Sequence, residues 1–182
     1  MLPPSTQDAS LDYLYDVEER PIWPKAPHGQ VVRYRVSFHG ISCQSHVVRF
    51  DENRAGSVRG EVKVWDRCHQ FEPYEAHGFY LTPTNFAPIK TAMANANLWS
   101  QAVSYWTDQD KYAICVDGVD VTFERRNSLD YRMGQSNVWC STTREFVIAA
   151  RMLLIAADDR AGLRLLPEVG DDQQSPHSPD AR

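Results

Sequence analysis

The sequence of 182 residues contains no apolar run long enough to span a membrane. Its first residues also lack the basic and then apolar pattern of a secretion signal, so we expect a cytoplasmic protein. Cysteine is scarce, with only Cys43, Cys68, Cys115 and Cys140. Without a secretion signal, so few cysteines predict free thiols and argue against a disulfide framework.

Familiar catalytic motifs are also missing. The chain has no Gly-x-Ser-x-Gly elbow, no phosphate-binding glycine loop, no His-Glu-x-x-His and no dinucleotide fingerprint. These absences favour a protein that is not an enzyme and holds no cofactor, although they leave unfamiliar chemistry open. The formal net charge of −5 argues against a nucleic acid as the partner.

Alternation of apolar and polar residues, which is typical of a strand with one buried face, recurs along the chain. The pattern predicts strands over residues 32–38, 45–50, 58–65, 112–116, 119–123 and 131–138. Asp117-Gly118 separates the fourth and fifth of these. This dipeptide favours a two-residue hairpin turn because both residues accept positive φ. We therefore expect residues 112–116 and 119–123 to pair with each other.

Two helices are expected from their capping residues. Thr82-Pro83 fits a cap followed by proline at the first helical position, and an apolar stripe then continues to Leu98. Thr142 and Glu145 have the spacing of a capping box and precede an amphipathic stretch that ends at Ala157. The sequence thus predicts an α+β fold. We expect an antiparallel sheet of about six strands in βββα-βββα order, with two principal helices packed on it.

The length and the 42% content of hydrophobic residues suit one domain with its own core. Residues 1–27, which are polar and then proline-rich, predict an extended or flexible N-terminal arm. Residues 28–160 form the predicted single α+β domain, and residues 161–182 form a mostly disordered acidic tail. Within that tail, the apolar residues between Leu163 and Val169 are candidates for a short docked strand.

Charged residues cluster around the hairpins predicted after residue 112. An enzymatic interpretation makes Asp120 or Glu124 a general base and Arg126 an anion clamp, because a carboxylate near a fixed guanidinium can hold and activate a polar substrate. The alternative is a solvated sheet face with weak cross-strand ion pairs. We favour this second interpretation.

Aromatic residues gather in and beside two segments without a clear period, 66–80 and 99–106. Exposed tryptophan and tyrosine are typical anchors of protein interfaces, because they bury a large area with few rotatable bonds. Together with the charged cluster they predict a partner-binding set: Asp117, Asp120, Glu124, Arg126, Trp65, Tyr74 and Trp106. Packing in the core is the alternative role for the aromatic members.

Basic residues occupy the polar phase of the first three predicted strands. Arg33, Arg35, Arg49, Arg59 and Lys63 would line one face of the sheet, and such a face can follow a phosphate backbone when aromatic residues lie nearby. Acidic residues alternate with them along the same strands. These acids and the net charge argue against nucleic acid.

One combination of residues has metal-ligand character: His39-x3-Cys43-x2-His46, with Cys68-His69 further along the chain. Zinc accepts thiolate and imidazole ligands in a closed tetrahedral site, so a zinc-stabilised regulatory protein is an alternative function. The paired knuckle spacing of zinc modules is missing, however. An ordinary hairpin with solvated histidines is therefore the favoured interpretation.

A longer pattern carries a resemblance. It comprises Asp117-Gly118, Glu124-Arg125, Tyr131-Arg132, Trp139 and the closing helix, preceded by the Thr-Pro helix that ends in Leu98-Trp99. Over residues 80–157 this pattern resembles small uncharacterised bacterial α+β proteins, some of which look like immunity proteins of contact-dependent or type VI toxin systems. The resemblance implies a cytoplasmic protein that binds and blocks another protein, such as a toxin or effector. It carries over no catalytic residue.

Overall fold

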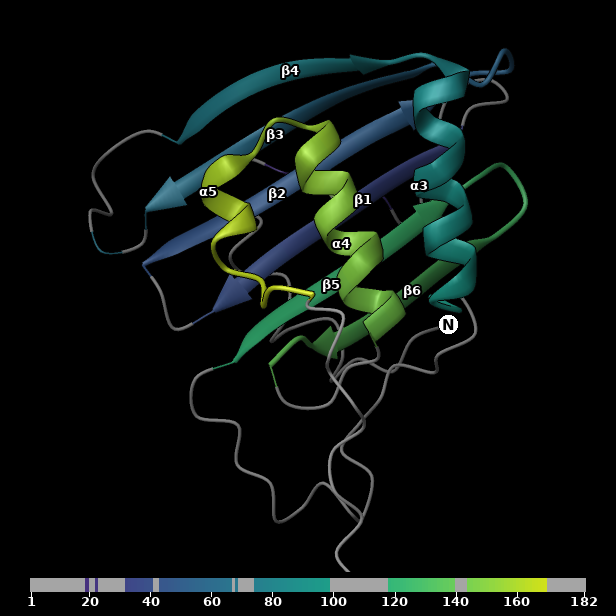
Figure 1. Ribbon diagram of the computed structural model, residues 1–182. Helices are drawn as coiled ribbons and strands as arrows, with labels where there is room; N and C mark the ends of the chain where they lie inside the picture. Colours follow the sequence, from purple (N-terminus) through teal and green to yellow (C-terminus); the bar gives the residue numbers. More distant parts are fainter. Residues whose placement is uncertain are drawn as a thin grey trace, which may run out of the picture.

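In a computed structural model, one antiparallel sheet carries helices packed against one of its faces (Figure 1). The structure describes residues 19, 22, 32–40, 43–66, 68, 74–98, 118–139 and 144–169. The strands are β1 (Val32–Gly40), β2 (Gln44–Glu52), β3 (Val58–Asp66), β4 (Glu75–Leu81), β5 (Val119–Arg126) and β6 (Tyr131–Asn137). They lie in the order β4-β3-β2-β1-β5-β6, and every neighbouring pair is antiparallel. The predicted α+β fold with a six-stranded antiparallel sheet is confirmed.

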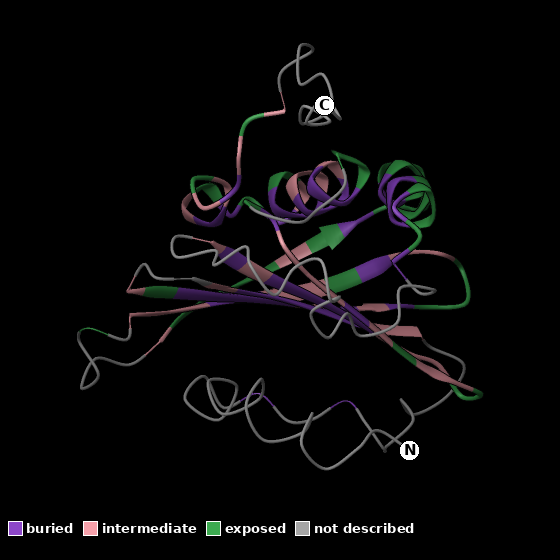
Figure 2. Cartoon of the chain, turned by 90° about the horizontal axis from the view of Figure 1, so that it is seen from below, coloured by how far each residue is buried: buried purple, intermediate pink, exposed green. Residues whose placement is uncertain are grey.

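Helices α3 (Pro83–Asn95), α4 (Arg144–Ala156) and α5 (Arg160–Leu163) lie side by side on the same side of the sheet (Figures 1 and 2). Helix α3 begins as its sequence predicts: the Thr82 hydroxyl accepts a hydrogen bond from the Asn85 amide at 3.3 Å, and Pro83 occupies the first turn. Thr142, the predicted cap of α4, lies outside the described residues, and α4 begins at Arg144.

The hydrophobic core fills the space between these helices and the sheet. Tyr34 of β1 and Phe50 of β2 stack with ring centroids 4.7 Å apart, and Phe86 of α3 meets Phe50 edge-on at 5.6 Å. On the other side of the core, Phe123 of β5 and Phe146 of α4 meet edge-on at 5.2 Å. Both geometries are favourable for aromatic rings. Burying each phenylalanine contributes about 1.5–3 kcal/mol, so these contacts fix α3 and α4 on the sheet.

The order of the elements differs from the prediction. Four strands precede α3, because β4 forms over residues in which the sequence has no clear period. Only β5 and β6 follow α3 among the described residues, and the predicted strand 112–116 lies outside them. Its expected pairing with residues 119–123 is wrong, because β5 pairs with β1 along one edge and with β6 along the other.

The packed part of the chain reaches residue 169. Leu166 is buried, and Leu163, Leu165 and Val169 pack against the core from α5 and the turns that follow it. The predicted tail therefore begins as a docked segment, and this segment consists of the end of α5 and the turns after it where a strand was expected. Within the described ranges, no helix has both the length and the apolar composition needed to cross a bilayer.

Candidate functional site on the polar face of the sheet

Strand alternation gives the sheet a second face, opposite α3, α4 and α5, which we call the polar face. Cross-strand register places these charged residues on it: Arg33, Arg35, Arg49, Asp51, Arg59, Glu61, Lys63, Asp120, Glu124 and Arg126. The five basic residues that the sequence predicted to share one face do so. Acidic residues stand beside them in register, as Arg35 opposite Glu124 and Arg49 opposite Glu61 illustrate.

The centre of the polar face is a buried ion pair. Arg35 Nε donates to Glu124 Oε2 at 2.5 Å, and the side chains are 1% and 3% exposed. The Tyr131 hydroxyl donates to the other carboxylate oxygen of Glu124 at 2.8 Å. Both oxygens of Glu124 are thus bonded within the fold. This arrangement satisfies a buried charge. A general base must reach a substrate proton, and the Glu124 side chain is nearly inaccessible.

A second cluster involves the N-terminal segment. Glu19 is buried, and its Oε1 lies 3.1 Å from both Arg49 Nη1 and Lys63 Nζ. Arg49 also pairs with Glu61 at 2.8 Å. The Lys63 ammonium lies 4.8 Å from the centroid of the Tyr74 ring, which is within the range of a cation–π contact. Glu19 therefore lies against the polar face, where it joins a cation of β2 to a cation of β3.

The outer parts of the polar face are more accessible. Arg33 and Asp51 form a bidentate pair at 2.6 and 2.8 Å, and each side chain is about one third exposed. The hydrogen bond to Asp51 raises the pKa of Arg33 above its ordinary value, against the lowering effect of burial. Arg59 is exposed, and its cross-strand neighbour Tyr80 is 64% exposed. An arginine and a tyrosine thus present their side chains together at the β3–β4 side of the sheet.

The structure brings most of the predicted partner-binding set to this one face. Asp120, Glu124, Arg126 and Trp65 lie on it by register, and Tyr74 contacts it through Lys63. Asp120 is half-buried and accepts a hydrogen bond from Asn137 Nδ2 at 3.1 Å, and Arg126 is also half-buried. Asp117 and Trp106 lie outside the described residues. Glu124 is too deeply buried to contact a partner directly.

The two main hollows among the described residues lie away from the residues of the enzymatic interpretation. One hollow of about 430 Å³ lies between α4 and the segment after α5, and Trp139, Arg151 and Leu166 are among its walls. Another of about 350 Å³ lies beside the start of α3, lined by Glu52, Phe86 and others. Neither hollow includes Asp120, Glu124 or Arg126.

The two histidines of the predicted metal site, His39 and His46, are not brought together. His39 pairs in register with Ser45, and His46 pairs with Phe38, so the two histidines lie on opposite faces of the sheet. His39 Nδ1 is 3.4 Å from the Ser45 hydroxyl, whereas His46 is buried among the helices. The two histidines are seven positions apart, one more than the cross-strand partners His39 and Ser45, and a shift of one residue along a strand reverses the face.

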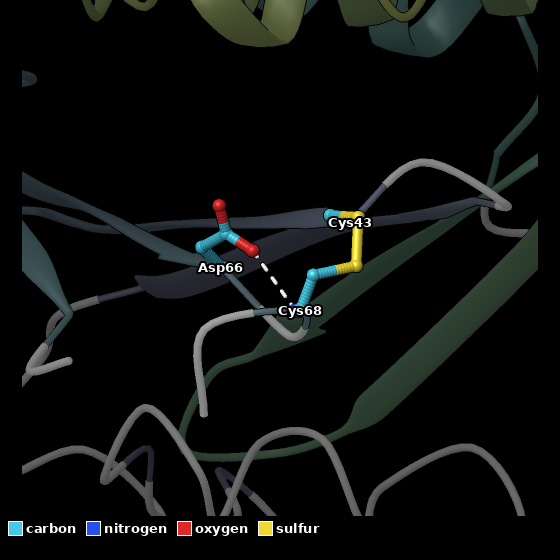
Figure 3. Close-up of side chains that lie close together, drawn as sticks. All are labelled: Cys43, Asp66 and Cys68. Atoms are coloured by element: carbon cyan, nitrogen blue, oxygen red, sulfur yellow. Dashed lines mark hydrogen bonds between the residues drawn. A yellow bond between two sulfur atoms is a disulfide. The ribbon is translucent and has the colours of Figure 1, made fainter. Parts of the chain in front are cut away.

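The expectation of free thiols is wrong for two of the four cysteines. Cys43 and Cys68 form a disulfide that joins the start of β2 to the residues after β3 (Figure 3). The reason is the β2–β3 register, which brings together residues 25 positions apart in the sequence. Cys115 and Cys140 lie outside the described residues, so the free-thiol expectation stays a prediction for them.

Sequence reasoning missed a buried polar pair on the helix side of the sheet. His46 Nδ1 lies 2.7 Å from Asp159 Oδ2, and the side chains are 0% and 3% exposed. Asp159 Oδ1 also accepts the Gly162 amide at 2.8 Å, which caps α5. Burial raises the pKa of Asp159, but the bonds from His46 and Gly162 outweigh it and hold that pKa below its ordinary value. The one available signal was a histidine in the apolar phase of a predicted strand.

Two comparisons of the sequence with known proteins give no relative. No protein-family model matches the sequence, and a search of curated proteins finds no match.

Proposed function

We propose that the chain is a non-enzymatic protein-binding module, of the kind that inhibits or neutralises a partner protein, and that it binds through the exposed parts of the polar face. The observation that carries this proposal is the pairing of exposed Arg59 with Tyr80 on a face where charges of both signs are held in register. Arginine and tyrosine are enriched among the residues that dominate protein interfaces.

The charge pattern of this face favours a protein over a nucleic acid. Arg33, Arg35, Arg49 and Lys63 each form an ion pair with an acidic residue of the same chain. A surface that follows a phosphate backbone needs cations that can release its counterions, and these four are already neutralised. Mixed charges in fixed positions instead give complementarity to a protein surface, together with discrimination against other partners.

The pairing of the carboxylates favours binding over catalysis. Glu124 bonds to Arg35 and Tyr131, and Asp120 bonds to Asn137. A general base must reach a substrate proton, and its carboxylate is best placed in a cleft. Glu124 and Asp120 instead form hydrogen bonds between neighbouring strands of the sheet.

The first test identifies the partner. The tagged chain would be captured from its own cells, and proteins that copurify in stoichiometric amount would be identified by mass spectrometry. Affinity would then be measured for Tyr80→Ala and Arg59→Glu. We expect Tyr80→Ala to weaken binding about tenfold or more, since anchors of this kind contribute more than about 1 kcal/mol. Arg59→Glu should weaken binding most at low salt, because the interaction is electrostatic.

The matched control is Asn95→Lys, which adds a charge at an exposed position of α3 on the opposite side of the molecule. It should leave affinity unchanged. If the two polar-face variants bind like the wild type while Asn95→Lys weakens binding, the partner contacts the helices and the proposed surface is wrong. If no protein copurifies with the wild type, the protein-binding function itself is contradicted.

A further inference from the structure

Three side chains with metal-ligand atoms meet at one end of the β2–β3 hairpin. Cys43 directly precedes β2, Asp66 ends β3, and Cys68 follows two residues later (Figure 3). One ligand atom from each residue lies within 4.8 Å of the other two. This grouping differs from the combination predicted from the sequence, with which it shares Cys43 and Cys68 but neither His39 nor His46.

The sheet fixes this grouping independently of the disulfide. β2 and β3 pair in continuous register from Gln44 opposite Asp66 to Glu52 opposite Val58. Asp66 is therefore held by the ladder of backbone hydrogen bonds, and Cys43 directly precedes Gln44, the residue opposite Asp66. The Cα atoms of Cys43 and Cys68 lie 5.2 Å apart. Breaking the bond between the sulfur atoms would leave both thiols close together, because the ladder does not depend on that bond.

A local hydrogen bond places the carboxylate. Asp66 Oδ1 accepts the backbone N–H of Cys68 at 2.9 Å, which turns the chain so that the Cys68 sulfur and the carboxylate lie on the same side of the turn (Figure 3). Bonds of this kind orient metal ligands before the metal arrives. Cys68 is exposed and Cys43 is half-buried, so a small reductant can reach the disulfide.

We propose that the reduced chain binds one thiophilic divalent cation of the zinc class through Cys43, Cys68 and Asp66. Two thiolates and one carboxylate suit zinc or cobalt(II), whereas magnesium and calcium prefer oxygen ligands alone. Three protein ligands leave the fourth tetrahedral position for water or another donor. The inference concerns the edge of the sheet at this hairpin and does not depend on the proposed protein-binding function.

Atoms and electrons are conserved in the change from the disulfide form to the metal-bound form. Two molecules of a small thiol reduce the disulfide of Cys43 and Cys68, giving two protein thiols and one small-molecule disulfide by thiol–disulfide exchange. The cation then displaces one proton from each protein thiol, so binding releases two protons per metal. The same two residues thus form a covalent bridge in an oxidising compartment and a metal site in a reducing one.

The experiment uses the full chain in both redox states. Protein reduced with a phosphine and then freed of reductant under argon would be titrated with cobalt(II), and the thiolate-to-cobalt charge-transfer absorption would be recorded. Zinc would then be added to displace the cobalt, and elemental analysis would give the metal content. We expect one metal per chain in the reduced protein and none in the oxidised protein.

Variants locate the site. In a background with Cys115→Ser and Cys140→Ser, binding should persist. In the same background, Cys43→Ser or Cys68→Ser should remove the charge-transfer absorption. Asp66→Asn keeps an oxygen that can accept the Cys68 amide but is a poorer ligand, and it should weaken zinc binding about tenfold or more, since even outer-shell changes cost that much.

Two results would overturn the inference. One is a reduced wild type that takes up no more metal than the oxidised protein. The other is undiminished metal content when both Cys43 and Cys68 are serine, which would mean adventitious binding elsewhere. Circular dichroism of this double variant, compared with the reduced wild type, shows whether loss of metal follows from loss of ligands or from unfolding. If the double variant is unfolded, the zinc affinity of Asp66→Asn decides the question. An affinity equal to that of the wild type would then count against the site.

Discussion

Replacing Asp159 with alanine would remove two buried hydrogen bonds, one that joins the sheet to the helical layer and one that caps α5. One is the bond to His46 Nδ1 at 2.7 Å, and the other is the cap on the Gly162 amide at 2.8 Å. Loss of a helix cap costs about 1 kcal/mol, and loss of a buried hydrogen bond to a charged group costs about 1.5–3 kcal/mol. We therefore expect the free energy of unfolding to fall by about 2.5–4 kcal/mol, a large share of the roughly 5–15 kcal/mol typical of a domain.

The burial of His46 supports the upper part of this range. Among the described residues, His46 Nε2 has no hydrogen-bond partner, so the fully buried imidazole is bonded there through Nδ1 alone. Removing the carboxylate would leave Nδ1, like Nε2, without a hydrogen-bond partner among the described residues. Polar groups buried without a hydrogen bond are costly, because water can no longer compensate them.

Urea unfolding followed by circular dichroism measures the effect. With a slope of about 2 kcal/mol per molar, the midpoint of Asp159→Ala should fall by roughly 1–2 M urea. The control is Asp158→Asn, which changes an adjacent side chain that is 83% exposed and keeps a residue that tolerates the positive φ of 54° found there. That control should stay within about 0.5 kcal/mol of the wild type. A loss below about 1 kcal/mol in Asp159→Ala, or an equal loss in the control, would refute the reasoning.

The same pair predicts a pH dependence. The pKa of Asp159 is lowered in the folded protein from its ordinary value of 3.8, so the folded state favours the ionised carboxylate. Its contribution to stability is therefore complete above the unfolded pKa and is lost as the pH falls through the lower folded pKa. The difference in stability between the wild type and Asp159→Asn should be constant near neutral pH and should shrink below about pH 4. A difference that grows on acidification would contradict this assignment.

Three further results are expected from urea unfolding. Arg35→Met and Glu124→Leu should each cost about 3–5 kcal/mol, and the double variant should lose less than the sum, because replacing both members removes the buried charges together. Glu19→Ala should cost about 1.5–3 kcal/mol, because it removes an acceptor shared by two cations. Gly60→Ala should cost about 1–3 kcal/mol, because its Cβ would collide with the Phe79 ring. Additive losses in the first case, or changes within about 0.5 kcal/mol in the others, would contradict these assignments.

Local patterns were enough to find most of the elements. Alternation located β1, β2, β3 and β5 within a few residues of their bounds, because each has one face in the core. β6 was located as well, although none of its residues belongs to the core. The edge strand β4 has five exposed residues among its seven, and a strand without a buried face shows no alternation. The start of α3 could be located from the Thr82 cap and Pro83, because both act within one turn of the helix.

Pairing between distant segments could not be predicted in the same way. Asp117-Gly118 is a strong local signal for a hairpin, yet β5 pairs with β1 and β6. The first of these pairings joins residues about ninety positions apart, as Arg35 and Glu124 show. The disulfide depends likewise on the β2–β3 register, and the ion pair between Glu19 and Lys63 joins residues 44 positions apart in the sequence. Such contacts are properties of the assembled fold, and no pattern within one segment contains them.

The burial of charge on the polar face bears on how a binding surface can be built there. Arg35 and Glu124 lie at its centre and are nearly inaccessible, whereas Arg59 and Tyr80 at its edge are exposed. A one-residue slip between β1 and β5 would move Arg35 away from Glu124 and towards the opposite face, which would be costly for both charges. The central pair therefore favours one register, and that register sets the positions of the exposed residues. Substitutions at the edge should change partner affinity with little loss of stability, and substitutions at the centre should do the reverse. If Tyr80→Ala instead lowered stability as much as Glu124→Leu, this division between a structural centre and a binding edge would be wrong.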